Sequence, residues 1–160
     1  MGFFMSTRYR NQKKRRTQSF ILIGDGFDEY EVICFLHKFR QAGLFIKSVS
    51  LFDKLVISKL GVGLKADFAL ADAPFDPQDD CLIILPSGGR NGDLLRRDAR
   101  VKKLLTSLNG GNGRIAITDS HCHLANDVDD MVTAQPLLRQ PASQGLEDFV
   151  DSLTSRFIYS

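Results

Sequence analysis

The 160-residue chain has no tryptophan, only three histidines and three cysteines, and no long hydrophobic run. Its apolar stretches, such as Phe20–Ile23 and Cys81–Leu85, are far shorter than the roughly 20 residues of a membrane-spanning helix. The apolar run Gly2–Met5 is too short for the core of a secretory signal. We therefore expect a protein that has no membrane span and resides in the cytoplasm.

The three cysteines, Cys34, Cys81 and Cys122, are widely spaced. No two of them have the CxxC spacing, which argues against a thiolate zinc site and against a disulfide framework. Free thiols persist in a reducing compartment, in keeping with the cytoplasm. The sequence predicts neither a structural metal nor a bound cofactor.

Charge is unevenly distributed, although the formal net charge is only +2. Residues 1–19 contain six of the 21 basic residues and no acid, which leaves 15 basic against 19 acidic residues in the remainder. We interpret 1–19 as a basic arm and 20–160 as a single domain. The arm would suit nucleic acid or an acidic partner, or it is a solvated terminus that aids solubility. Its basic residues are Arg8, Arg10, Lys13, Lys14, Arg15 and Arg16.

Strand-like and helix-like segments alternate after the arm. Apolar runs predict strands over 20–23, 45–51, 81–85 and 115–118, and a hairpin with a glycine turn within 54–70. Helical spacing predicts a helix from the N-cap Asp28 to Gly43, one or two helices within 94–108, and a last helix over 145–157. Residues 120–141 have no clear pattern. This alternation is typical of a parallel sheet, whose ligands bind beyond the carboxyl ends of its strands.

The stretch Gly26-Phe27-Asp28-Glu29-Tyr30-Glu31, the run Leu82–Gly89, the segment Lys102–Leu108 and the strand Ile115–Thr118 follow one another in a characteristic order. Together they resemble the ThiJ/PfpI family, which includes the parkinsonism-associated protein deglycase and has a class I glutamine-amidotransferase-like fold. The resemblance implies a flavodoxin-like α/β three-layer sandwich with a mostly parallel sheet. It also implies that Glu31 is the helix glutamate that contacts a nucleophilic cysteine, and that Gly88 and Gly89 form an oxyanion hole.

The family's cysteine position falls on Thr118, so the resemblance implies a divergent member that lacks the usual nucleophile. It also implies a shortened one, because only about twenty residues, Leu124 to Pro141, lie where the family has a further helix and strands. The family's downstream histidine then has no counterpart. Threonine is β-branched and unsuited to a strained elbow, so we expect a relaxed turn and an inert Thr118.

The leading hypothesis is therefore a pseudoenzyme that binds a small anionic or carbonyl metabolite, or serves as an interaction or regulatory module. We expect a homodimer or a subunit of a larger assembly. Two backbone N–H groups facing a helix start suit an anion. The residues expected to bind the ligand are Gly88, Gly89, Thr118, Asp119 and His121.

Two enzymatic alternatives stay open. Cys122 follows Thr118 by four residues, and in the first turn of a helix it would be favoured as a thiolate, giving a cysteine-dependent hydrolase or glyoxalase-like enzyme with Glu31. Its structural alternative is a small buried apolar residue, and that of Glu31 is a helix-capping carboxylate. His121 and His123 resemble the metal-binding start of TatD-type hydrolases, and a metal-dependent hydrolase is the other alternative.

Overall fold

The computed structural model describes residues 17–76, 79–120, 122–132 and 137–158. Its strands are β1 (Gln18–Ile23), β2 (Ile46–Ser50), β3 (Leu55–Ile57), β4 (Gly63–Lys65), β5 (Phe68–Ala69), β6 (Cys81–Leu85), β7 (Arg114–Ile117) and β8 (Leu137–Arg139). Its helices are α2 (Glu29–Gln41), α3 (Asn91–Arg97), α4 (Ala99–Ser107), α5 (Leu124–Met131) and α6 (Leu146–Ile158), with a short 3-10 turn over Leu70–Asp72. The predicted basic arm lies outside the described residues as far as residue 16, and β1 begins within its expected bounds, at Gln18.

Six strands form one sheet in the order β5-β2-β1-β6-β7-β8, and neighbouring strands run parallel. The strands β3 and β4 form a separate antiparallel hairpin, as predicted, and Gly61 in its turn has φ 89°. From β1 the chain first adds β2 and β5 on one side of β1, and it then adds β6, β7 and β8 on the other side. The point where the strand order reverses therefore lies between β1 and β6, where ligands bind in folds of this kind.

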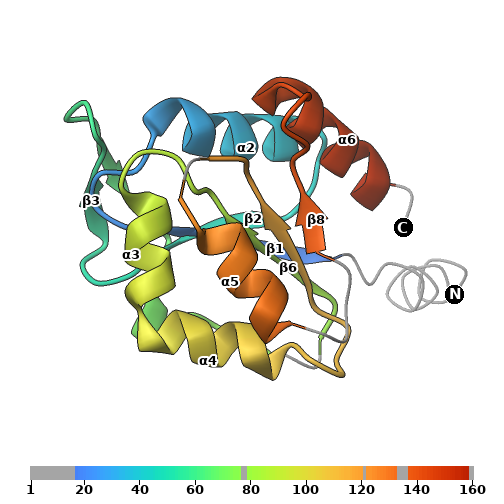
Figure 1. Ribbon diagram of the computed structural model, residues 1–160. Coiled ribbons are helices and arrows are strands. Elements are labelled where there is room, and N and C mark those ends of the chain that lie inside the picture. Colours follow the sequence, from blue (N-terminus) through green and yellow to red (C-terminus); the bar gives the residue numbers. More distant parts are fainter. Residues whose placement is uncertain (1–16, 77–78, 121, 133–136, 159–160) are drawn as a thin grey trace, which may run out of the picture.

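Two layers of helices cover the sheet, with α2 and α6 on one face and α3, α4 and α5 on the other (Figure 1). Successive side chains of β1 alternate between them: Ile21 joins the core under α2 and α6, and Leu22 joins the opposite core. All five residues of β6 are buried because both faces of that strand are covered. The predicted α/β three-layer sandwich of flavodoxin-like type is confirmed.

Residues 120–141 contain more structure than the sequence pattern predicts. They form the eight-residue helix α5 and the three-residue edge strand β8, so this part is not the short connection we expected. Both elements are too short for a periodic signal, although Leu124 and Val128 of α5 are buried in the core. In the described part of the chain, no helix is long and apolar enough to cross a membrane.

Candidate functional site

The loops that follow β1, β6 and β7 meet at one rim of the sheet, because β6 pairs with β1 on one side and with β7 on the other. The prediction that these three strand ends lie side by side is confirmed. Asn91, fully buried at the start of α3, fastens two of them. Its amide donates to the carbonyls of Leu22 at 3.1 Å and Pro86 at 2.6 Å. Its Oδ1 accepts the Gly24 N–H at 2.7 Å, so one side chain fixes the ends of β1 and β6.

Glu31 lies in the first turn of α2, where the sequence placed it. The predicted N-cap is confirmed, since the Asp28 carboxylate accepts the N–H groups of Tyr30 and Glu31. The Glu31 carboxylate turns away from this cap and accepts the Gly88 N–H at 3.0 Å. Glu31 therefore connects the loop after β1 with the loop after β6, which a residue confined to helix capping would not do.

The Glu31 side chain is buried, with 6% of the residue exposed. Burial raises the pKa of Glu31 to about 7, although hydrogen bonds from the Gly88 N–H and the Thr118 hydroxyl favour its charged form. The nearby Asp28 raises the pKa further, and Lys59, whose ammonium lies 3.0 Å from the Asp28 carboxylate, lowers it. The carboxyl group therefore gains and loses its proton near neutral pH.

Thr118 follows β7 directly and is 1% exposed, and Ser87, just after β6, is 3% exposed. The Thr118 Oγ1 accepts the Ser87 N–H at 2.8 Å and lies 3.0 Å from the Ser87 Oγ. The Ser87 hydroxyl donates to the Thr118 carbonyl at 2.7 Å. No non-glycine residue in the described ranges has positive φ, so the expected relaxed backbone at Thr118 is confirmed. With Glu31, these residues form what we call the Glu31–Ser87–Thr118 cluster.

The glycine pair after β6 is shaped by its neighbours. At Gly88, a Cβ would lie 3.1 Å from a Glu31 carboxylate oxygen. Gly89 has φ 59°, and a Cβ there would collide with the carbonyl oxygen of Gly26. The Gly88 N–H is already bonded to Glu31, whereas the exposed Gly89 N–H has no hydrogen-bond partner among the described residues. The predicted pair of anion-binding N–H groups is thus reduced to one free donor.

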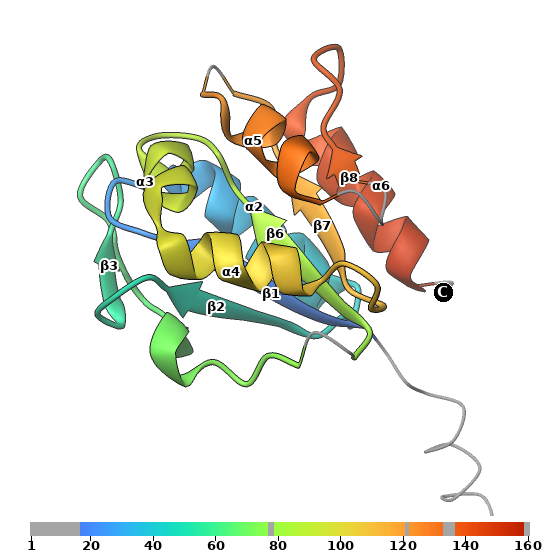
Figure 2. The same ribbon diagram turned by 60° about the horizontal axis from the view of Figure 1, so that its bottom comes forward.

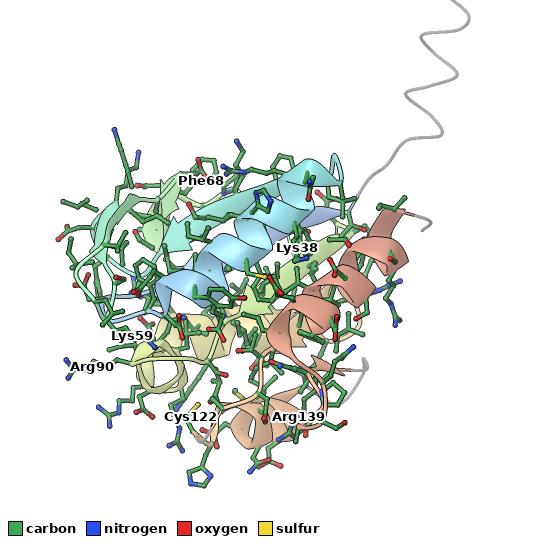
Figure 3. All side chains as sticks on the ribbon, turned by 90° about the horizontal axis from the view of Figure 1, so that it is seen from above. Lys38, Lys59, Phe68, Arg90, Cys122 and Arg139 are labelled. Atoms are coloured by element: carbon green, nitrogen blue, oxygen red, sulfur yellow. The ribbon has the colours of Figure 1, made fainter. Side chains whose placement is uncertain are left out.

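Cys122 lies at the same rim and is half-buried (Figure 3). Its Sγ accepts a hydrogen bond from the Ser120 hydroxyl at 3.1 Å and would lie 2.5 Å from a Cβ on Gly92 of α3. The thiol therefore packs against the start of α3. Among the described residues, no hydrogen bond joins Cys122 to Glu31. The two proposed catalytic residues therefore lie at the same rim without the hydrogen bond that would couple them.

Among the described residues, neither Asp119 nor His123 has a hydrogen bond to this cluster. Asp119 is exposed, and its N–H donates to the Gln140 side chain at 2.9 Å. His123 is exposed at the N-cap position of α5, and His121 lies outside the described residues. The described part of the chain contains no group of three histidine, cysteine or acidic residues that could hold a metal ion.

The expectation that the chain lacks the family's cysteine is not confirmed, because Cys81 lies buried in β6, one of the strands that form the rim. It is the first residue of β6 and therefore lies at the strand's amino end. Burial raises the pKa of Cys81 to about 11, and the charge of Asp80 adds to the effect. Burial also raises the pKa of Cys34 on α2. Both thiols are protonated at neutral pH.

The β3–β4 hairpin forms a wall beside the rim. The Lys59 N–H donates to the Phe27 carbonyl at 2.8 Å, and the Gly26 N–H donates to the Ile57 carbonyl at 2.7 Å. Figure 3 shows Lys59 and Arg90 together at this end of the molecule. The hairpin carries exposed apolar side chains toward solvent, which are Leu55, Ile57, Leu60 and Val62.

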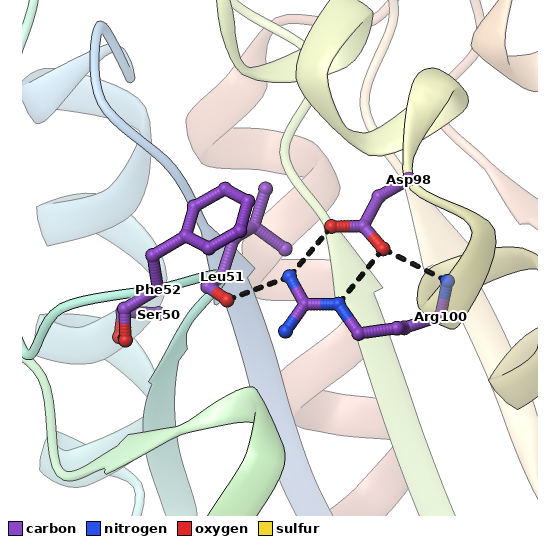
Figure 4. Close-up of polar contacts among 5 residues, drawn as sticks. All are labelled: Ser50, Leu51, Phe52, Asp98 and Arg100. Carbon is purple, nitrogen blue, oxygen red and sulfur yellow. Dashed lines mark hydrogen bonds and ion pairs between the residues drawn. The ribbon is translucent and has the colours of Figure 1, made fainter.

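The end of β2 is held by an arginine that sequence reasoning missed. The Arg100 guanidinium donates to the Leu51 carbonyl and to the Asp98 carboxylate, each at 2.7 Å (Figure 4). The same guanidinium stacks on the exposed Phe52 ring, 4.8 Å from its centroid. These hydrogen bonds lower the pKa of Asp98. Nothing in the spacing of Arg100 or Asn91 distinguishes them from ordinary helix residues, so only the structure identifies both clamps.

Comparison with solved structures confirms the fold. DJ-1beta of Drosophila melanogaster superposes with a TM-score of 0.72 at 16% identity, over 91% of this chain and 92% of that one. Schizosaccharomyces pombe DJ-1 gives 0.68 at 19% identity, over 88% and 91%. A DJ-1 superfamily protein of Salmonella typhimurium, solved as a cysteine-to-alanine mutant, gives 0.70 at 16% identity, over 90% and 91%.

Comparison with curated protein sequences gave no match. The sequence model of the DJ-1/PfpI family matches residues 18–153, a range that includes the whole sheet and the rim. The ThiJ/PfpI resemblance, first drawn from four short stretches, is therefore confirmed over most of the chain. The chain belongs to the DJ-1/PfpI family.

Proposed function

We propose that this chain is a non-catalytic DJ-1/PfpI domain that acts as a protein-interaction module and pairs with a second copy through its β3–β4 hairpin. One observation carries the proposal. The groups best suited to chemistry, those of Glu31, Ser87 and Thr118, are buried and bonded to one another or to backbone. A substrate would have to break this cluster before it reached any of them.

A threonine hydroxyl also needs a base to become a nucleophile. At Thr118 the hydroxyl oxygen already accepts the Ser87 N–H, and its neighbour Glu31 is partly protonated at neutral pH. Transfer of the hydroxyl proton to the Glu31 carboxylate would leave a charged threonine alkoxide in a buried site, which burial disfavours. The cluster is better suited to holding the three loops together.

The hairpin supplies the interaction surface. Four apolar residues along it are well exposed, at 62% for Leu55, 42% for Ile57, 77% for Leu60 and 49% for Val62. Exposed apolar residues grouped on one element mark interaction sites in soluble proteins. The outer edge of β3 is bonded through Ile57 to the loop after β1, so the outer edge of β4 is the one that can pair with the same element of a second copy. Such pairing satisfies backbone groups and buries both sets of side chains.

Sedimentation velocity on wild type and Leu60→Asp tests this proposal. We expect a dimer at micromolar concentration for wild type and a monomer for Leu60→Asp, with unchanged circular dichroism since the residue is 77% exposed. Ile158→Asp, on the 47% exposed Ile158 of α6, is the matched control and should remain dimeric. A wild-type monomer, or a dimer that survives Leu60→Asp, would contradict pairing through the hairpin.

We place the proposed module in the cytoplasm, because its three cysteines are free and free thiols persist in a reducing compartment.

A cysteine-dependent enzyme is the second candidate, because the Cys122 thiol lies half-exposed at the rim beside the Ser120 hydroxyl. A catalytic thiolate reacts rapidly at mildly acidic pH. For a non-catalytic domain, we expect iodoacetamide at pH 6 to label Cys122 no faster than a cysteine in an unstructured peptide. Labelling at least tenfold faster, and slowed by Glu31→Gln, would support the enzyme instead.

A further inference from the structure

Figure 2 shows the edge strand β8 and the helix α6 on the opposite side of the molecule from the hairpin. A groove lies between these two elements. Its volume is about 1010 Å³, which includes space open to solvent. Leu138, Phe149 and Leu153 give it an apolar floor, and Gln144, Ser152 and Ser155 give it hydrogen-bonding groups. No residue of the Glu31–Ser87–Thr118 cluster lines the groove, although β8 pairs with β7, the strand that Thr118 follows.

The strand beside this groove has one open edge. β8 pairs with β7 on one side and has no strand on the other among the described residues. The Gln140 N–H bonds to the Ile117 carbonyl, so the backbone of the preceding residue, Arg139, points away from β7. Its N–H and carbonyl are placed to pair with an extended segment that lies along the groove.

The positive charge of the groove favours an acidic segment as its ligand. Two arginines, Arg139 and Arg156, line it, and no acidic residue does so in the described part of the chain. The Arg139 guanidinium lies 3.6 Å from the Asp129 carboxylate, and both side chains are about half exposed, at 46% and 53%. Arg156 has no ion pair among the described residues. An incoming carboxylate would form an ion pair with Arg156 and would compete with Asp129 for the Arg139 guanidinium.

We propose that this groove binds an extended acidic peptide segment of a partner protein, which adds to the sheet as a strand beside β8. Main-chain hydrogen bonds to Arg139 supply affinity, side chains on the floor supply burial, and the two arginines select carboxylates. This inference rests on the proposed interaction function and adds to it a second surface and the chemistry of the partner.

The probe is a fluorescein-labelled eight-residue peptide of alternating valine and glutamate, with a valine–lysine peptide as control. Fluorescence anisotropy at low salt should show micromolar binding of the acidic peptide and at least tenfold weaker binding of the basic one. Arg156→Glu should weaken binding at least tenfold. Arg97→Glu, the same charge change on an exposed α3 arginine, should leave binding unchanged. Asp129→Asn should strengthen binding severalfold by freeing Arg139.

A pair of variants separates strand addition from simple charge attraction. Arg139→Ala removes the side chain, and Arg139→Pro also removes the outward N–H while sparing the hydrogen bonds to β7. We expect Arg139→Pro to bind at least fivefold more weakly than Arg139→Ala, with heat denaturation checking that both are folded. Equal binding by these two variants, or by the acidic and basic peptides, would overturn the proposal.

The peptide measurements are repeated in the Leu60→Asp background, so that a failure of hairpin pairing and a failure of the groove are seen separately. Loss of pairing with intact peptide binding contradicts only the proposed dimer. A second copy of the chain is the other occupant that an open edge permits. A dimer that persists in Leu60→Asp and disappears in Arg139→Pro would show β8 pairing with β8 and would overturn the peptide proposal.

Discussion

At the scale of single residues, Glu31 makes stability depend on pH. Its pKa is about 7 in the folded chain against 4.5 for an unperturbed carboxyl, so the folded state holds the proton more tightly. The resulting stabilisation is complete below pH 4.5 and is lost as pH rises toward 7, above which the effect is constant. A shift of this size corresponds to roughly 3 kcal/mol at most.

We expect Glu31→Gln to abolish this dependence. The glutamine amide keeps an oxygen that can accept the Gly88 N–H, and it carries no titrating proton. Urea unfolding at pH 5, 6, 7 and 8 measures the free energy of unfolding of both proteins. The difference between wild type and variant should change steadily from pH 5 to pH 7, in favour of the variant. A difference that stays constant over this range would show that Glu31 is already charged when folded.

The family resemblance placed Glu31 and Gly88 at one site, and the structure joins them by a hydrogen bond. Sequence reasoning gave Ser87 no role, because the hydrogen bonds of that residue join the end of β6 to Thr118 at the end of β7. Nor did it predict that the Gly88 N–H would already donate to the Glu31 carboxylate. Such pairings depend on the register of β6 against β7, which no spacing within one strand encodes.

At the scale of elements, the turn between β6 and α3 depends on Gly89. Its φ of 59° strains any other residue, and a Cβ would meet the Gly26 carbonyl in the loop after β1. We expect Gly89→Ala to destabilise the fold by roughly 1–3 kcal/mol from the backbone alone, with the collision adding to this. Gly110→Ala is the control, because Gly110 has φ 81° and open space around it.

Urea denaturation of the two variants isolates the contact between the loops. Gly89→Ala should lower the free energy of unfolding by more than Gly110→Ala does. The difference should exceed about 1 kcal/mol, which is the order of magnitude of a steric conflict within a packed structure. Equal decreases in stability would mean that the loops after β1 and β6 can move apart without a cost in free energy.

Elements with long, buried apolar runs were predicted well. β6 has the bounds expected from Cys81–Leu85, and α2 ends before Gly43 as the cap signal indicates. α5 and β8 were missed because each is short and the residues of β8 are only partly buried or exposed at the sheet edge. Their stability comes from the neighbours they pack against, and not from their own pattern.

At the scale of the whole molecule, Asn91 connects the two halves of the sheet where the strand order reverses. Asn91→Leu keeps the side-chain volume and leaves the Gly24 N–H and two carbonyls without a partner. Each buried unpaired group costs about 1–3 kcal/mol, so we expect a loss of roughly 3 kcal/mol or more. Asn126→Leu, on the exposed Asn126 of α5, should change stability little. Urea denaturation measures both, and a wild-type value for Asn91→Leu would contradict the role of this clamp.

The packing of α2 against α6 has a consequence for how the chain matures. Phe35 and Phe39, near the beginning of the sequence, complete their core only with Phe149 and Leu153, near its end. Synthesis must therefore reach α6 before this face of the sheet can be covered. Until then the aromatic rings of α2 remain exposed to solvent, where they can bind chaperones or promote aggregation. We therefore expect this face of the domain to fold slowly, and only after α6 has been synthesised.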